Sequence, residues 1–129
     1  MRIWLMMALL GGCSMGADLD AGKAAVGEFH QRYDKGYFAA IDAAAGDEIK
    51  AAPGGLTPVL TTVQARLGKV KTSNQTGFND RVDNGDHRLE LSYDTSFEKA
   101  PGTEQFVFLL SSGKPVLIGY HVNSAALLN

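Results

Sequence analysis

The sequence of 129 residues has little cysteine, no excess of charge of one sign and no long hydrophobic run. A single cysteine excludes an intramolecular disulfide framework and a zinc site built from several cysteines. The 12 Lys and Arg stand against 14 Asp and Glu, and this balance, without a basic stripe, argues against a nucleic-acid-binding protein. No apolar run reaches the roughly 18 residues of a membrane-spanning helix. The length suits one domain.

The sequence also lacks the patterns that bind cofactors and metals. Gly54-Gly55 stands outside the strand–glycine–helix context of a phosphate-binding loop. The charged residues within 80–86 lack the ligand order of a calcium loop. The histidines are far apart and show no paired spacing on one helix; they are His30, His87 and His121. We therefore expect no cofactor and no metal.

The amino terminus has the layout of a secretory signal, because the positive charge of Arg2 precedes an apolar run over residues 3–10. This run is too short to cross a bilayer of about 30 Å as a helix. It leads into Leu10-Gly11-Gly12-Cys13, which resembles the lipobox of bacterial lipoproteins: an aliphatic residue and two small residues before a cysteine. The alternative interpretation is a buried core cysteine in a cytosolic protein.

The lipobox resemblance implies a specific processing and location. Residues 1–12 would be removed as a signal peptide, and Cys13 would carry acyl chains on its thiol and on its new amino group. Two or more acyl chains give stable membrane anchoring, whereas one gives marginal binding. Ser14 stands where an aspartate would resemble an inner-membrane retention signal, which points to the outer membrane, facing the periplasm. Residues 13–18 are then the lipidated cysteine and a short tether, and residues 19–129 are the folded domain.

Hydrophobic periodicity predicts helices in the first half of this domain. Residues 19–35 carry apolar side chains at three- and four-residue steps, with Asp18 as the N-cap. A second helix is expected over residues 37–45. A third begins at Thr57-Pro58 and ends before Gly68. Its apolar stripe consists of Val59, Leu60, Val63 and Leu67.

After Gly68 the hydrophobic period changes to two, which is typical of strands. Residues 70–82 predict a polar edge strand with a bulge at Gly77, and residues 83–86 contain an Asn-Gly pair typical of a hairpin turn. Further strands are expected over 87–97, 104–110 and 116–122. Helices followed by a strand meander predict an α+β fold, with the N-terminal helices packed on one face of a four-stranded antiparallel sheet.

This layout resembles the nuclear transport factor 2-like (cystatin-like) superfamily, and in particular its small secreted bacterial members. The segments that carry the resemblance are Tyr33-Asp34-Lys35-Gly36-Tyr37, Leu67-Gly68-Lys69-Val70 and the strands over 89–99, 104–106 and 117–124. The similarity covers about residues 19–128. It implies a cone formed by the curved sheet and its helices. The superfamily includes isomerases, dehydratases, ligand binders and interaction modules, so the resemblance implies a fold rather than an activity.

Four aromatic residues are candidates for lining a pocket in this cone: Tyr93, Tyr120, Phe29 and Phe38. Tyr93 and Tyr120 alternate with aliphatic residues, which is typical of core aromatics whose hydroxyls reach a partner. His30 lies off the main apolar stripe and Asp42 sits among alanines, so we expect both to be solvated. No nucleophile, base and orienting group can be recognised together, and we assign no catalytic residue.

The last two predicted strands are apolar on both faces, which suggests that the outer face of the sheet is covered by something. If Phe106 and Phe108 meet the helices, and Ile118 does so on the next strand, their neighbours face away. The candidate interaction face consists of Val107, Leu109, Leu117 and His121. A second copy of the chain, another protein and the chain's own residues 124–129 are the alternatives for covering it.

These observations favour a lipid-anchored, non-catalytic binding or interaction module, of which an envelope immunity or inhibitor lipoprotein is one specific form. Its partners would be the membrane, through the lipid on Cys13, and a protein or second copy through the sheet face. A small enzyme of isomerase or dehydratase type is one alternative, and a structural envelope component is another. A hollow cone with a tyrosine beside a buried acid or histidine would favour the enzyme, and a filled cone would count against it.

Overall fold

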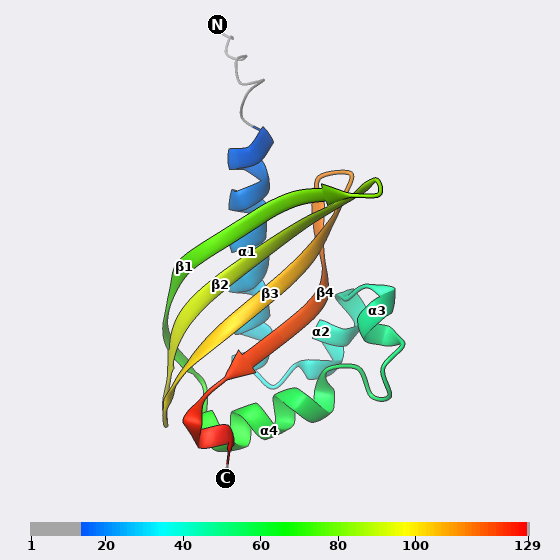
Figure 1. The fold of residues 1–129 in the computed structure, drawn as a ribbon. Helices are drawn as coiled ribbons and strands as arrows, with labels where there is room; N and C mark the ends of the chain where they lie inside the picture. Colours follow the sequence, from blue (N-terminus) through cyan, green and yellow to red (C-terminus); the bar gives the residue numbers. More distant parts are fainter. Residues whose placement is uncertain (1–13, 129) are drawn as a thin grey trace, which may run out of the picture.

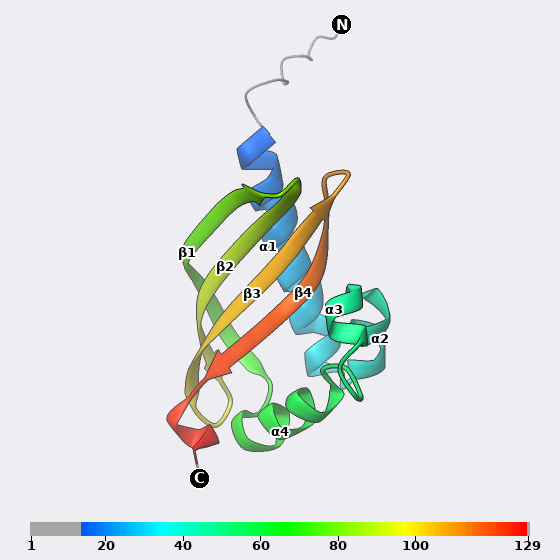
Figure 2. The same cartoon turned by 45° about the vertical axis from the view of Figure 1, so that its right-hand side comes forward.

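The computed structural model describes residues 14–128, in which helices precede strands (Figures 1 and 2). The helices are α1 (Ser14–Asp34), α2 (Phe38–Ala44), α3 (Asp47–Lys50) and α4 (Thr57–Leu67). The strands are β1 (Val70–Asp83), β2 (Asp86–Phe97), β3 (Pro101–Ser111) and β4 (Lys114–Asn123), followed by a 3₁₀ helix, η2 (Ala125–Leu127). This order confirms the predicted α+β class. The predicted signal peptide, residues 1–12, and Cys13 lie outside the described residues.

The four strands form one antiparallel sheet in the order β1-β2-β3-β4, which is the predicted meander. The bulge expected at Gly77 is present as a register shift, and Asn84 and Gly85 in the β1–β2 turn both have positive φ. The sheet curves around α1, which runs along its inner face (Figure 1). The β1–β2 and β3–β4 hairpins lie at the end of the sheet where α1 begins, and α4 crosses the opposite end near the C-terminus (Figures 1 and 2).

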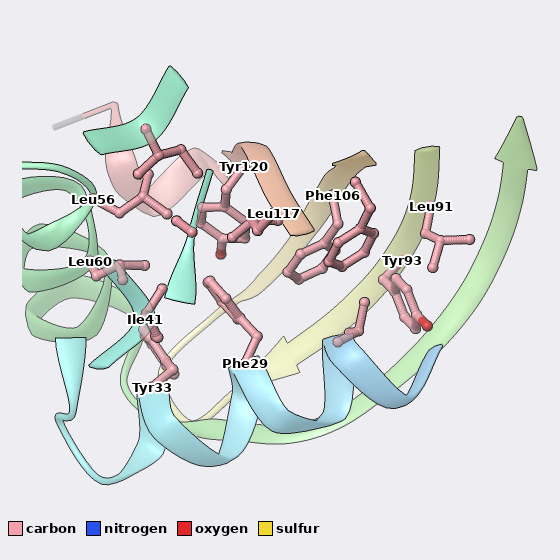
Figure 3. Packing of buried hydrophobic residues seen from close by; sticks show 14 of the residues in the cluster. Phe29, Tyr33, Ile41, Leu56, Leu60, Leu91, Tyr93, Phe106, Leu117 and Tyr120 are labelled. Atoms are coloured by element: carbon pink, nitrogen blue, oxygen red, sulfur yellow. The ribbon is translucent and has the colours of Figure 1, made fainter. Parts of the chain in front are cut away.

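The core lies between α1 and the inner face of the sheet, with α2 and α4 closing it (Figure 3). The alternation predicted for β2 is confirmed, because its odd-numbered residues from Leu89 to Phe97 are buried. Phe29 and Tyr33 of α1 pack against them, and Phe106 of β3 fills the centre with no exposed surface. The α4 stripe is confirmed at Leu60, Val63 and Leu67, whereas Val59 is exposed.

Helix α1 begins earlier than predicted. It starts at Ser14, so Asp18 lies inside the helix instead of capping it, and residues 14–18, expected as a tether, form its first turns. No proline separates Ser14 from Leu19, and Leu19 packs against the core, so the helix continues toward the amino terminus. In the part of the chain that the structure describes, none of the helices combines the length and apolar character needed to span a bilayer.

Strand β4 corrects the predicted interaction face. Leu117 points into the core and is buried, whereas Ile118 is partly exposed, the reverse of the prediction. The cause is a bulge: Val107 pairs with Gly119 and Phe108 with Leu117, which leaves Ile118 unpaired. The extra residue shifts the alternation by one position. An unbroken apolar run such as that around Leu117 gives no sign of this shift.

The region between α2 and α4 differs from the prediction in two ways. Helix α3 was not expected, and the Gly46 N–H before it donates to the Leu117 carbonyl at 2.8 Å, which attaches the α2–α3 connection to the edge of β4. Asp42, expected to be solvated, accepts hydrogen bonds from Leu56 N and Thr57 Oγ1 at 2.7 Å each. The carboxylate of α2 therefore satisfies a free N–H at the start of α4.

The described C-terminal residues do not cover the outer face of the sheet. Ser124 caps η2, and Ala126 and Leu127 pack against the core beside α4. The Leu127 carbonyl lies 3.5 Å from Arg66 Nη1 of α4. Covering of the outer face by residues 124–128 is thus excluded, since this segment turns toward the helices.

Candidate functional site

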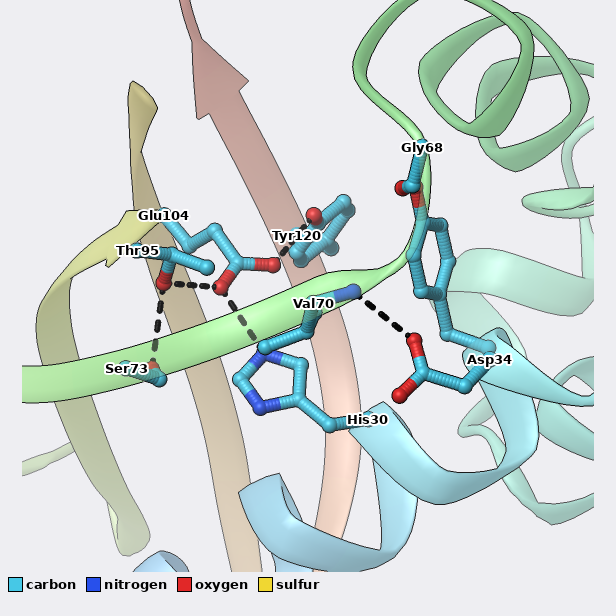
Figure 4. Close-up of polar contacts among 9 residues, drawn as sticks. His30, Asp34, Gly68, Val70, Ser73, Thr95, Glu104 and Tyr120 are labelled. Atoms are coloured by element: carbon cyan, nitrogen blue, oxygen red, sulfur yellow. Dashed lines mark hydrogen bonds and ion pairs between the residues drawn. The ribbon is translucent and has the colours of Figure 1, made fainter. Parts of the chain in front are cut away.

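A buried carboxylate is the centre of a polar network between α1 and the sheet (Figure 4). Glu104 of β3 points inward, and its side chain is only 1% exposed. Its Oε1 accepts a hydrogen bond from Thr95 Oγ1 at 2.6 Å and lies 2.8 Å from His30 Nε2. Its Oε2 accepts from the Tyr120 hydroxyl at 2.6 Å. Ser73 extends the network, with its Oγ 3.1 Å from Thr95 Oγ1.

The Thr95 and Tyr120 hydroxyls donate to the Glu104 carboxyl oxygens, which accept. The Thr95 hydroxyl is engaged as a donor to Glu104, so the Ser73 hydroxyl donates to Thr95. His30 Nε2 faces the same carboxyl group and, when the imidazole is protonated, forms a part-buried ion pair with it. The network therefore joins α1 to all four strands through one acidic side chain.

Two members of this network were misjudged from the sequence. His30, expected to be solvated, is 12% exposed and turned toward the sheet. Glu104 was not singled out, although it lies in phase with Phe106 and Phe108, which were predicted to face the helices. A charged residue on the inner side of an alternating strand needs partners, because unpaired burial of a charge is costly. That signal was present in the sequence.

Burial raises the pKa of three tyrosines that face the core. Loss of solvent raises the pKa of the Tyr120 hydroxyl well above its ordinary value, and the charge of Glu104 and the hydrogen bond to it add to this effect. For Tyr93, burial again comes first and the charge of Glu104 second. The pKa of Tyr33 is raised in the same way, with Asp34 and Glu98 contributing after Glu104.

Alkaline pH should therefore destabilise the protein. An unfolded tyrosine ionises near pH 10, while these three stay protonated in the folded state, so the folded state holds more protons. The stabilisation is complete below about pH 10 and is lost as the pH rises above it, by up to about 1.4 kcal/mol per pH unit for each tyrosine. Urea unfolding between about pH 8 and pH 11.5 measures this. Tyr120→Phe should flatten the decline, Tyr37→Phe at an exposed site should not, and a flat wild-type profile would contradict the assignment.

Three of the four predicted pocket residues lie together, and they fill the cone. The rings of Phe29 and Tyr120 are 4.8 Å apart, and Tyr93 joins them through Phe106, with 5.8 Å between ring centres. Phe38 lies apart from these three residues, and its ring centre is 6.1 Å from that of Tyr33. A small cavity of about 80 Å³ lies between α1, α2 and the last two strands; Phe29 of the predicted set lines it, and neither tyrosine does.

The segment that carries the family resemblance holds the entry of the chain into the sheet. The Tyr33 hydroxyl donates to the Gly68 carbonyl at 2.6 Å. Asp34 Oδ1 accepts from Val70 N at 2.9 Å (Figure 4). Gln64 Nε2 of α4 donates to the Tyr33 carbonyl at 2.6 Å. These two neighbouring residues at the end of α1 thus fix the position where β1 begins.

The outer face of β3 and β4 has an apolar strip, which we define as Val107, Leu109, Val116 and Ile118, all partly exposed. Of the predicted interaction face, Val107, Leu109 and His121 lie on this face, and His121 is exposed. A groove of about 630 Å³ runs between the strip and the α2–α3 connection. Asp47 and Glu48 form its acidic rim, and both are exposed.

Three ligand-type side chains meet at the hairpin end of the inner face: Asp18 of α1, Asp80 of β1 and His87 of β2. One nitrogen or oxygen of each lies within 4.8 Å of the others. His87 Nε2 lies within hydrogen-bonding distance of Asp80 Oδ1 and 3.8 Å from Asp18 Oδ2. The expectation of no metal rested on the absence of closely spaced ligand residues in the sequence. Such spacing gives no information about ligands that come from three separate elements.

The chain therefore has three features with functional potential: the buried Glu104 network, the outer apolar strip with its acidic rim, and the Asp18–Asp80–His87 group. The first is closed to solvent, and the other two are accessible. Their role has to be argued from geometry and chemistry, because no protein-family model, no curated protein and no solved structure matches this chain.

Proposed function

We propose that this chain is a lipid-anchored, non-catalytic binding module of the bacterial cell envelope. Cys13 anchors it at the periplasmic face of the outer membrane, and the outer apolar strip binds a partner protein. The observation that carries the binding role is the open groove beside the strip, with its apolar floor and acidic rim. Scattered apolar surface residues are common, whereas a contiguous strip beside a groove is typical of an interaction site.

The closed state of the Glu104 network supports binding over catalysis. A general acid or base has to come within hydrogen-bonding distance of the proton it transfers. The Glu104 carboxylate is 1% exposed, and its partners are protein side chains on both oxygens. The aromatic rings that were candidates for lining a pocket pack against one another. This filled cone argues for a structural role of the carboxylate.

The chemistry of the groove selects the kind of partner. Its floor is formed by Leu109, Val116 and Ile118, which favour an apolar side chain. Asp47 and Glu48 at the rim place negative charge beside that floor, which favours lysine or arginine next to the apolar residue. The partner is therefore a protein segment with an apolar side chain flanked by basic residues.

The order of the elements also supports the proposed relation to the nuclear transport factor 2-like superfamily. Helices precede a four-stranded meander that curves around the first helix (Figure 1). Tyr33 and Asp34, from the segment that carries the resemblance, bind the start of the sheet. That superfamily includes interaction modules, so the relation is compatible with a binding role.

The anchor is tested by replacing the single cysteine. In cells given a labelled fatty acid, we expect the wild-type protein to carry label and to sediment with outer membranes. Cys13→Ser should lose the label and leave the outer-membrane fraction, because the thiol that accepts the first acyl group is gone. Ser14→Ala serves as the control and should keep both properties. Unchanged labelling and sedimentation of Cys13→Ser would overturn the anchoring proposal.

The binding role is tested with a displayed library of random peptides. Selection on the purified protein should enrich sequences in which lysine or arginine adjoins an aliphatic or aromatic residue. Leu109→Asp should reduce binding of the enriched peptides at least about tenfold, because one charge in the apolar floor costs more than 1.4 kcal/mol. Ser96→Asp is the matched control, because Ser96 of β2 lies on the same outer face of the sheet as Leu109 but away from the strip. Peptides without basic residues, binding that survives Leu109→Asp, or self-association through the strip would each overturn the proposed partner.

A further inference from the structure

The Asp18–Asp80–His87 group is assembled by the close approach of α1 to β2. A Cβ atom on Gly22 would lie 2.6 Å from Leu89 Cδ2, so a larger residue at this position would force the Leu89 side chain to shift, whereas glycine lets the helix lie directly against the strand. Asp18 lies one helical turn before Gly22, and His87 lies two residues before Leu89 on the same face of β2. The packing that brings Gly22 onto Leu89 therefore brings Asp18 onto His87.

The hairpin supplies the third side chain from the same face. Asp80 pairs with Leu89 in the β1–β2 ladder, and Val82 pairs with His87, so Asp80 and His87 are diagonal neighbours on the inner face. The Asp80 side chain is 10% exposed and the Asp18 side chain 19%. Two carboxylates thus converge on one imidazole in a partly dry environment that remains open to solvent at His87.

The charge balance at this place favours a bound cation. Arg81 and Arg88 of the hairpin pair with each other in the ladder and face the outer side of the sheet. There they form ion pairs with other acids: Arg81 with Asp83 and Glu90, and Arg88 with Asp86. Within residues 14–128, the group that lies between the two inward carboxylates is His87. Neighbouring carboxylates repel unless a cation lies between them.

We propose that Asp18, Asp80 and His87 bind a divalent first-row transition metal ion of the zinc class. The donors would be His87 Nε2 with one carboxylate oxygen from each aspartate. An imidazole with two carboxylates suits zinc, cobalt or manganese, whereas calcium and magnesium take six or more oxygen ligands. Zinc bonds of about 2.0–2.2 Å place ligand atoms roughly 3.3 Å apart. The three atoms lie within 4.8 Å of one another, so small side-chain rotations complete the site.

The site goes beyond the proposed binding function, because it lies on the inner face and the groove lies on the outer face. A bound ion would clamp the beginning of α1 to the β1–β2 hairpin, at the end of the sheet where α1 begins (Figure 2). A ligand that binds only the folded state stabilises it. The ion would therefore raise the thermal unfolding midpoint without taking part in partner binding.

The test uses the full chain without a histidine tag, stripped of metal with EDTA. Titration with cobalt(II) should give a saturable visible absorption at one equivalent, and zinc should displace the cobalt and raise the unfolding midpoint. His87→Gln and Asp80→Asn should each weaken binding at least about tenfold, since losing even a supporting residue of a metal site costs 10–100-fold. Asp20→Asn on α1 and Asp83→Asn on β1 are matched controls and should bind as wild type does.

Three further results decide the proposal. Cys13→Ser is titrated in parallel and should bind cobalt normally, which separates this site from the lone thiol and from the anchoring proposal. Asp18→Asn, on the helix surface, should weaken binding while circular dichroism shows an intact fold. Absence of a cobalt spectrum in wild type, equal binding by His87→Gln, or loss of binding in Cys13→Ser would overturn the site. His87→Gln should leave the binding of the selected peptides unchanged. Failure of the partner-binding proposal can therefore be distinguished from failure of the metal site.

Discussion

Replacing Glu104 with alanine should lower the unfolding free energy by about 3–5 kcal/mol. The carboxylate accepts hydrogen bonds from Thr95 and Tyr120, which are buried with it, and faces His30, whose side chain is 12% exposed. Removal leaves two hydroxyls and an imidazole without their acceptor in a place that water does not reach. The cost is large because one partner of a buried pair is removed while the others stay.

Urea denaturation followed by circular dichroism at about pH 7.5 measures this effect. Glu90→Ala is the matched control, because Glu90 lies on the outer face of β2 and its ion pair with Arg81 is partly exposed, at 23% for Glu90 and 46% for Arg81. Exposed pairs contribute about 0–1 kcal/mol, so the control should change little. Glu104→Gln keeps the volume and one acceptor oxygen and should lose less than alanine does. A loss below about 1 kcal/mol for Glu104→Ala would show that the network does not hold α1 to the sheet.

The Phe106→Ala variant should show a similarly large loss, about 3–5 kcal/mol, for a different reason. Phe106 has no exposed surface and lies among aromatic rings (Figure 3). Its ring centre is 5.0 Å from that of Phe29 and 5.1 Å from that of Tyr120, and it stacks with Phe108 at 6.3 Å. Truncation removes a whole ring from these contacts and leaves a cavity that the surrounding rings cannot fill.

Phe78→Ala is the matched control for the Phe106 variant. Phe78 is also a phenylalanine on the inner face of the sheet, but it lies on the edge strand β1 and is 50% exposed. Its truncation should cost less than about 1 kcal/mol, because solvent already covers half of the ring. The two unfolding curves, recorded under the same conditions, should therefore separate clearly. Equal losses at the two positions would mean that the core is not organised around Phe106.

The sequence predicted the succession of elements because local periodicity reflects which side chains are buried together. The alternation of β2, the bulge at Gly77 and the turn at Asn84-Gly85 were all readable from neighbouring residues. The face of the sheet that each strand residue occupies was predicted less well. The unbroken apolar run in β4 hid a bulge, so Leu117 was placed on the wrong face and Ile118 took its position. The start of α1 was misplaced because Asp18 looks like a cap from its neighbours alone.

The candidate functional residues show the same difference between local patterns, which the sequence reveals, and distant contacts, which it does not. Aromatic residues for the core could be recognised from the pattern, and Glu104 could have been, since it alternates with Phe106. The partners of Glu104 could not, because His30 lies 74 residues away on a helix whose rotation about its axis is set by packing. Asp42 likewise binds Leu56 at the start of α4, 14 positions further along the chain.

By itself, the sequence determined the α+β class and the meander, because each depends on residues close together in the chain. The lipid anchor at Cys13 is a proposal from a local motif of the same kind. The tertiary structure alone decided that the cone is filled, that β3 and β4 present Ile118 in place of Leu117, and that Asp18, Asp80 and His87 meet. The physical reason is that these outcomes depend on contacts between segments that are distant in the chain. The β3–β4 register and the packing of Gly22 against Leu89 are two such contacts.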